Sequence, residues 1–122
     1  MNGFIDTSGR ALLSVELLPD SDSPASVVDV WIDTGFTGDL VLPIDIIERL
    51  RLRHSGSIDA VLADGSRTEL NTYSCLVKWF GIIKPLEVIA NDGESPLLGV
   101  GLLLGLELRA NYHTLELSLT TP

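Results

Sequence analysis

The feature that most constrains this chain is an acidic residue set between two short apolar runs. Residues Val27–Ile32 are rich in β-branched side chains, which favours a strand. The triplet Asp33-Thr34-Gly35 follows directly, and a second apolar run, Leu40–Leu42, ends at Pro43. A glycine permits a sharp turn that leaves backbone N–H groups exposed. The pattern therefore predicts a carboxylate on a tight turn at the end of a strand, which is a suitable place for chemistry.

Length and composition limit what surrounds this turn. The chain has 122 residues, which predicts a single domain spanning residues 1–122. Its hydrophobic fraction of 45% is enough for one modest core and too high for disorder. The net charge of -9 argues against nucleic acid or an anionic membrane as a partner, because both require a basic surface.

Other sequence features indicate the cellular compartment in which the protein is expected. The single Cys75 excludes an internal disulfide framework and fits a reducing environment. The residues Met1–Asp6 have neither a basic start nor an apolar core, so no secretory signal is visible. The longest apolar run, Leu97–Leu106, is far shorter than the roughly 18 residues of a membrane span. We expect a soluble, cytoplasmic protein.

Most of the remaining sequence has strand character. Turn residues at Asp6–Arg10 and Asp64–Ser66 each separate two apolar or alternating runs, which predicts two hairpins. Ile44–Arg51 has one apolar face at helical spacing, and His54–Ser57 is expected to end that helix. Val100–Leu108 is expected to form a short buried helix. The other expected strands are Gly3–Ile5, Ala11–Leu18, Ile58–Ala63, Arg67–Tyr73, Ser74–Phe80, Pro85–Ala90 and Thr114–Leu119. The prediction is a mainly β chain with a closed or folded-over sheet.

Three motifs in this order resemble one known family. The Asp-Thr-Gly triplet between two strands, the Asp64-Gly65 hairpin, and Leu97-Leu98-Gly99 before an apolar helix are similar to the retropepsin-like aspartic proteases. These are the half-size, dimeric relatives of pepsin. The resemblance covers the chain from about Ala11 to its C-terminus. It implies a closed, folded-over β-barrel with two short helices and one lobe per chain.

The resemblance also implies roles for particular residues. Asp33 would be the catalytic carboxylate, the Thr34 hydroxyl would join a hydrogen-bond network across a dimer, and Gly35 would allow the turn. The residues Ala63, Asp64, Gly65 and Ser66 would form the tip of a flap that closes over substrate. The segment Leu97, Leu98 and Gly99 would pack beneath the loop that carries Asp33. No metal or organic cofactor is implied.

The implied activity is that of an aspartic endopeptidase acting on a peptide or protein substrate. Two carboxyls that share one proton can both activate a water and protonate the leaving nitrogen, and aspartic proteases are the standard case of such a pair. This chain offers one such Asp, so the second would come from an identical subunit across a two-fold axis. The resemblance therefore implies a homodimer and an inert monomer.

Two departures from the family pattern are visible. Phe36 stands where pepsin-like enzymes place Ser or Thr and retropepsins place Ala. The hydroxyl that would donate to the carboxylate in pepsin-like enzymes is absent, which predicts a mildly acidic to neutral optimum. Thr37 and Val100 stand where retroviral members carry an Asp and an Arg that brace the dimer. An inactive dimerisation or peptide-binding module of the same fold is the alternative function.

Several competing interpretations are weaker. Asp6-Thr7-Ser8-Gly9 resembles the triplet but is better explained as a hairpin turn. The glycines of Gly99–Gly105 do not have dinucleotide-loop spacing. Cys75 is expected to be a buried thiol, and His54 and His113 have no metal-ligand spacing. A small β-barrel unrelated to proteases, with a ligand at its mouth, remains a third possibility.

Overall fold

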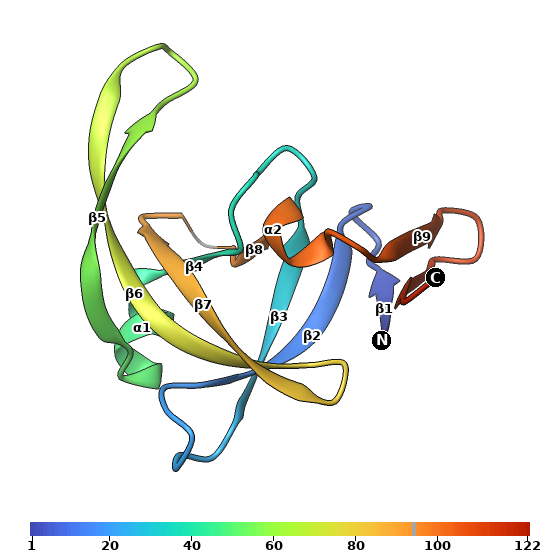
Figure 1. Cartoon of the computed structure of the whole chain (residues 1–122). Helices are drawn as coiled ribbons and strands as arrows, with labels where there is room; N and C mark the ends of the chain where they lie inside the picture. Colours follow the sequence, from blue (N-terminus) through green and yellow to red (C-terminus); the bar gives the residue numbers. More distant parts are fainter. Residues whose placement is uncertain (94) are drawn as a thin grey trace.

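The computed structural model describes residues 1–93 and 95–122. These residues form ten strands and two short helices (Figure 1). The strands are β1 (Asn2–Ile5), β2 (Ala11–Leu18), β3 (Ser26–Ile32), β4 (Leu40–Pro43), β5 (Arg53–Val61), β6 (Arg67–Trp79), β7 (Ile82–Asn91), β8 (Leu97–Leu98), β9 (Glu107–Asn111) and β10 (Glu116–Thr120). The helices are α1 (Ile44–Leu50) and α2 (Val100–Leu103). The expected mainly β fold with two short helices is confirmed.

The strands form one continuous sheet that folds back on itself. Their order is β5-β6-β7-β4-β8-β3-β2-β1-β10-β9, and an additional pairing joins β6 to β2. That pairing places Glu16–Leu18 against Leu76–Lys78 and closes a ring of β2, β3, β8, β4, β7 and β6. The sheet is mixed, because β3 runs parallel to β8 and β4 runs parallel to β7. The terminal strands β1, β10 and β9 continue the sheet beyond the ring.

The core lies inside this ring. Strands β2 and β3 alternate between buried and exposed residues, so one face of each is turned inward. Strand β4 is buried at every position, as expected for a strand covered on both faces. The fully buried side chains include Leu13, Val30, Leu42, Val88 and Leu98, which come from β2, β3, β4, β7 and β8. Five strands of the ring therefore contribute to one core.

Most of the predicted turns and hairpins are confirmed. β1 and β2 pair around Asp6–Arg10, and β5 and β6 pair around the Asp64-Gly65 turn. Helix α1 begins without a side-chain cap at Pro43 and ends at Arg51, which adopts the left-handed conformation. The expectation that His54–Ser57 ends this helix as a turn is wrong. These residues belong to β5, which contains a bulge between His54 and Gly56.

The C-terminal part differs more from the prediction. Helix α2 has only four residues, and the expected helix over Val100–Leu108 is wrong beyond Leu103. Leu104 has already left the helical conformation with a ψ of 132°, and Gly105 follows with a φ of 82°, a conformation that suits glycine. The chain then continues as β9, which pairs with β10 in an antiparallel hairpin. This additional hairpin places β10 beside β1.

The free Cys75 is buried in β6, as the sequence predicts. Burial raises the pKa of its thiol from 9.0 to about 11. As the pH rises, the thiol ionises in the unfolded chain before it ionises in the folded one. The contribution of the protonated Cys75 to the stability of the fold is therefore complete below about pH 9 and is lost towards pH 11. We expect an alkylating reagent to modify Cys75 slowly at neutral pH and rapidly in denaturant, measured by mass spectrometry. Equal rates in both conditions would contradict the buried position.

Helices long and apolar enough to cross a membrane are not found among residues 1–93 and 95–122.

Candidate active site

The loop that carries Asp33 begins where β3 ends. The N–H of Trp31 donates to the carbonyl of Pro96 at 2.9 Å, and the N–H of Asp33 donates to the carbonyl of Leu98 at 2.8 Å. The carbonyl of Asp33 accepts a hydrogen bond from the N–H of Phe36 at 3.2 Å, which closes a tight turn. β8 therefore fixes the backbone on the N-terminal side of the carboxylate, and the turn fixes it on the other side.

The carboxylate is oriented by its own turn. The N–H of Gly35 donates to Oδ1 of Asp33 at 2.9 Å. A Cβ at position 35 would lie 3.2 Å from the same oxygen, which is a tight approach that glycine avoids. Asp33 itself is half-buried, whereas Thr34 is exposed. The hydroxyl of Thr34 has no hydrogen-bond partner within the described chain, so it is free to donate to or accept from another molecule.

The start of α2 holds the rest of this loop. The N–H groups of Gly99, Val100 and Gly101 donate to the carbonyls of Asp39, Phe36 and Gly38 at 2.9, 2.8 and 3.0 Å. The first N–H groups of a helix have no partner within the helix, so the loop carbonyls satisfy donors that would otherwise be unpaired. Leu97 and Leu98 pair with β3 on one side and β4 on the other. The segment Leu97-Leu98-Gly99 thus lies directly against the loop of Asp33.

Phe36 occupies the space that two glycines leave open. A Cβ at Gly38 would lie 2.5 Å from the Phe36 ring, and a Cβ at Gly99 would also lie 2.5 Å from it. The Gly99 Cβ would in addition overlap the carbonyl oxygen of Gly38. The aromatic side chain that departs from the family pattern is therefore packed into the junction between the loop and α2.

Asp33 borders a hollow of about 420 Å³, lined by Trp31, Ile32, Asp33, Thr34 and Leu97. Trp31 is 38% exposed, and the guanidinium of Arg10 lies 5.8 Å from the centre of its ring. A cation over an indole face is attractive and keeps the ring in place. The sequence analysis assigned Trp31 no role in this hollow. The alternation of β3 does indicate one, because Val30 and Ile32 face the core and Trp31 between them faces outward.

The competing triplet at the first hairpin has a structural role. Asp6 accepts hydrogen bonds from the N–H of Ser8 at 3.0 Å and the N–H of Arg10 at 2.8 Å. The Nε of Arg10 donates to its other oxygen at 2.7 Å. The pKa of Asp6 is lowered, mainly by the N–H of Arg10. Both oxygens of its carboxylate accept hydrogen bonds within the β1–β2 turn, which confirms the hairpin interpretation.

The predicted flap residues Ala63, Asp64, Gly65 and Ser66 form the tip of the β5–β6 hairpin. In Figure 1 this hairpin and the loop after β3 both extend toward the top of the view. The N–H of Leu62 donates to the carbonyl of Ser66 at 2.8 Å, and Gly65 has a φ of 84°. The hydroxyl and the N–H of Ser66 donate to Oδ1 of Asp64 at 2.6 and 2.9 Å. The tip is therefore held by backbone and side-chain hydrogen bonds of its own.

These bonds lower the pKa of Asp64, the Ser66 hydroxyl having the largest effect. The turn is consequently most stable above pH 3.8, and this stabilisation is lost as the pH falls through the lowered value. We expect Ser66→Ala to raise the pKa of Asp64 towards 3.8, measured by NMR titration of its carboxyl carbon. The exposed Ser57 provides a control, because Ser57→Ala should leave that pKa unchanged. An unaltered titration in Ser66→Ala would show that the hydroxyl does not bind Asp64 in solution.

Groups of three or more His, Cys, Asp or Glu side chains that could hold a metal ion are not found in the described part of the chain. The two histidines lie on different elements: His54 is on β5, beside the ring of Tyr73 at 5.4 Å, and His113 is in the β9–β10 turn.

No protein-family model matches the sequence, and no curated protein is detectably similar to it. Solved structures are similar. A retropepsin-like aspartic protease from Rickettsia conorii matches with a TM-score of 0.68 at 16% identity, over 98% of this chain and 88% of that one. EIAV protease in complex with the inhibitor HBY-793 matches with a TM-score of 0.56 at 22% identity, over 80% of this chain and 88% of that one. The retroviral protease-like domain of Ddi1 from Leishmania major matches with a TM-score of 0.50 at 16% identity, over 88% of this chain and 86% of that one.

These matches cover most of the chain and contradict a barrel unrelated to proteases. The chain has the retropepsin-like aspartic protease fold.

Proposed function

We propose that this chain is one half of an aspartic endopeptidase that works as a symmetric homodimer. The observation that carries the proposal is the position of Asp33. It lies on a tight turn that borders a hollow, with one carboxylate oxygen bound by the N–H of Gly35. The same fold occurs in a retropepsin-like aspartic protease from Rickettsia conorii. One chain supplies one such carboxylate, so the pair requires two chains.

The proposed reaction needs no group beyond the two carboxyls and a water. Two carboxylates within a few ångströms cannot both ionise, so the pair holds one proton. The ionised Asp33 takes a proton from a water, which attacks the peptide carbonyl, and the protonated Asp33 polarises that carbonyl oxygen. Return of the proton to the amide nitrogen then releases the two products.

The remaining site residues would position these groups. Gly35 would orient the carboxylate, and the exposed Thr34 hydroxyl would hydrogen-bond the loop of the second subunit. Ala63, Asp64, Gly65 and Ser66 would close over the peptide and exclude water. Leu97, Leu98 and Gly99 would hold the loop from behind through the hydrogen bonds of β8 and α2. The single Cys75 per chain fits a reducing compartment, and we therefore propose the cytoplasm as the location.

The second candidate is a non-catalytic dimerisation or peptide-binding module. Phe36 favours it, because this aromatic ring stands beside the loop where a pepsin-like enzyme has a hydroxyl. The two functions separate in a cleavage assay with a library of quenched peptides, followed by mass spectrometry of the products. The peptidase predicts cleavage at defined bonds by the wild-type chain and none by Asp33→Asn. Binding of peptides without cleavage would favour the module, and cleavage that survives in Asp33→Asn would place the activity elsewhere.

A further inference from the structure

The hairpin of β6 and β7 ends in an apolar turn, residues 80–83, which we call the β6–β7 turn. The side chains of Phe80, Ile82 and Ile83 are 36%, 61% and 52% exposed. Single apolar side chains are common on a protein surface, whereas several together mark a site of contact with a protein or a membrane. Figure 1 shows this turn at the free end of the hairpin, beyond the place where β6 pairs with β2. It therefore presents a projecting apolar surface.

The β6–β7 turn is ordered, and its first residue is unusual. Phe80 and Gly81 have φ values of 50° and 82°, as in the two-residue turn that closes an antiparallel hairpin. The first position of such a turn favours Asn, Asp or Gly, so a phenyl ring there is opposed by the backbone conformation. The ring meets that of the buried Trp79 edge to face, with 5.5 Å between the two centroids. An ordered aromatic residue in this conformation points to a role outside the turn itself.

Positive charge accompanies these apolar side chains. Both lysines of the chain lie beside the turn, Lys78 on β6 and Lys84 on β7. Residues 75–86 contain no Asp or Glu, although the chain has 17 of them. Glu16 on β2 lies opposite Lys78, but neither lysine takes part in an ion pair within the described residues. The end of this hairpin is therefore a cationic and apolar point on an acidic protein.

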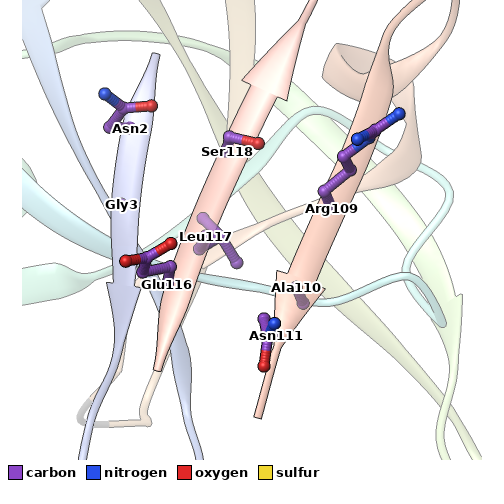
Figure 2. A pocket seen from close by; sticks show the side chains of 8 residues that line it. All are labelled: Asn2, Gly3, Arg109, Ala110, Asn111, Glu116, Leu117 and Ser118. Carbon is purple, nitrogen blue, oxygen red and sulfur yellow. The ribbon is translucent and has the colours of Figure 1, made fainter. Parts of the chain in front are cut away.

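A hollow of about 600 Å³ on the terminal strands β1, β10 and β9 has a different character. Figure 2 shows Asn2, Ser118 and Arg109 beside one another there, on three neighbouring strands. Arg109 is already paired with Glu107, with 2.6 Å between Nε and Oε1. The lining of this hollow is mostly polar, so it lacks the combination of large exposed apolar side chains and unpaired cations that the β6–β7 turn provides.

We propose that the β6–β7 turn docks the chain on the surface of an anionic phospholipid membrane. The three apolar side chains would enter the boundary between headgroups and acyl chains. The two lysines would bind lipid phosphates around them, because a long lysine stem can lie along apolar surface while its ammonium group stays at the headgroups. An apolar groove of a partner protein fits less well, because it would bury both cations with the turn. The proposal does not depend on peptidase activity.

The hairpin geometry suits such a contact. Trp79 pairs with Ile82, and Lys78 pairs with Ile83, directly behind the turn. These pairs satisfy the backbone groups of the strands within the hairpin, so few of them would be left unpaired when the turn leaves water. The apolar side chains are also ordered before the contact forms, which reduces the entropy lost on binding.

The net charge of -9 argues against an anionic membrane only for the chain as a whole. Exposed charges farther apart than about 8 Å are largely screened at physiological ionic strength, so the charges at the turn decide the contact. The cytoplasmic leaflet of a membrane is the one with a negative surface potential. A contact with it agrees with the location that we propose for the chain.

The test is sedimentation of the whole chain with vesicles, either of phosphatidylcholine or of an equal mixture of phosphatidylcholine and phosphatidylglycerol. The wild-type chain should bind the mixed vesicles more tightly, and added salt should weaken that binding. Ile82→Thr combined with Ile83→Thr keeps β-branched side chains in the strand and should weaken binding roughly tenfold or more. Lys78→Glu combined with Lys84→Glu should weaken it by a similar factor. Glu16→Gln should strengthen it, because an anion opposite Lys78 is removed.

Matched controls lie on other elements. Arg49→Glu combined with Arg53→Glu makes the same change of net charge on α1 and β5, where the side chains are exposed. Ile44→Thr removes an apolar side chain that is exposed on α1. Both controls should bind the mixed vesicles as the wild type does. All of these substitutions change surface side chains, so the thermal unfolding of each variant should stay close to that of the wild type.

A fluorescent reporter locates the contact. Ile82→Trp adds an indole at the turn, and vesicles with brominated acyl chains should quench its emission above the background of the two natural tryptophans. Ile44→Trp on α1 should not be quenched. Failure of the wild-type chain to bind either kind of vesicle would overturn the proposal, as would undiminished binding by Ile82→Thr with Ile83→Thr. Self-association that requires the turn, without vesicle binding, would also overturn it and would make the turn a protein interface.

Discussion

Asp33→Asn is expected to abolish peptide hydrolysis, lowering kcat by about 10⁴-fold or more, as removal of an essential catalytic group does in other hydrolases. The amide cannot take a proton from the attacking water, so neither role of the carboxyl pair survives. The substitution should leave the fold intact, because the Asn side-chain oxygen can still accept the N–H of Gly35. The measurement is the rate of cleavage of a good library peptide, with thermal unfolding and sedimentation as checks on fold and assembly.

A mixing experiment makes this prediction specific for a pair of carboxyls across two subunits. When equal amounts of wild-type and Asp33→Asn chains exchange freely, about one quarter of the dimers contain two Asp33 residues. Activity should then fall to about a quarter of that of a fully wild-type sample at the same total concentration. Activity that falls only to half would show that each subunit works alone, and the dimeric mechanism would be wrong.

Gly99→Ala is expected to destabilise the chain by about 3 kcal/mol, at the upper end of the cost of overpacking. The added Cβ would overlap the carbonyl oxygen of Gly38 and lie 2.5 and 2.7 Å from the ring and carbonyl oxygen of Phe36. Two of these obstacles are backbone atoms of the Asp33 loop, so they can move only if the loop moves. The free energy of unfolding should be measured by denaturant titration, and peptidase activity should fall with it.

Gly56→Ala is the matched control. A Cβ at Gly56 meets only the Thr72 hydroxyl at 3.7 Å, which is ordinary contact. Its unfolding midpoint should stay close to that of the wild type. A second variant, Gly99→Ala combined with Phe36→Ala, removes the ring but leaves the Gly38 carbonyl in place. Phe36→Ala alone loses the packing of the ring, so the double variant is compared with that single variant. It should still be less stable than Phe36→Ala, and equal stability of the two would assign the whole clash to the ring.

Much of the fold near the proposed site follows from local sequence rules. The β-branched run before Asp33, the Asp64-Gly65 turn and the apolar face of Ile44–Leu50 each act over a few residues. Such patterns predict the element without knowledge of its neighbours. The order of the three motifs predicted the retropepsin-like fold, and the structural similarity confirms it.

The C-terminal segment shows where local rules fail. Leu102, Leu103, Leu104 and Leu106 give an apolar run that fits a helix or a buried strand equally well. The helix ends at Leu103, before Gly105, and pairing with β10 decides that β9 is a strand. His54–Ser57 is a similar case, because polar residues that read as a turn are held in β5 by pairing with β6. The packing of Phe36 against Gly99 also escaped prediction, because it joins residues more than sixty positions apart.

The pairing of β2 with β6, which closes the ring of strands, affects how the chain folds. Leu17 of β2 pairs with Val77 of β6, which lies 60 positions later in the chain. Contacts of such high sequence separation form slowly, because a long loop must close before they contribute. Until then β2 and β6 keep unpaired edges that can join strands of other molecules. Refolding should therefore be slow, and its yield should fall as the protein concentration rises.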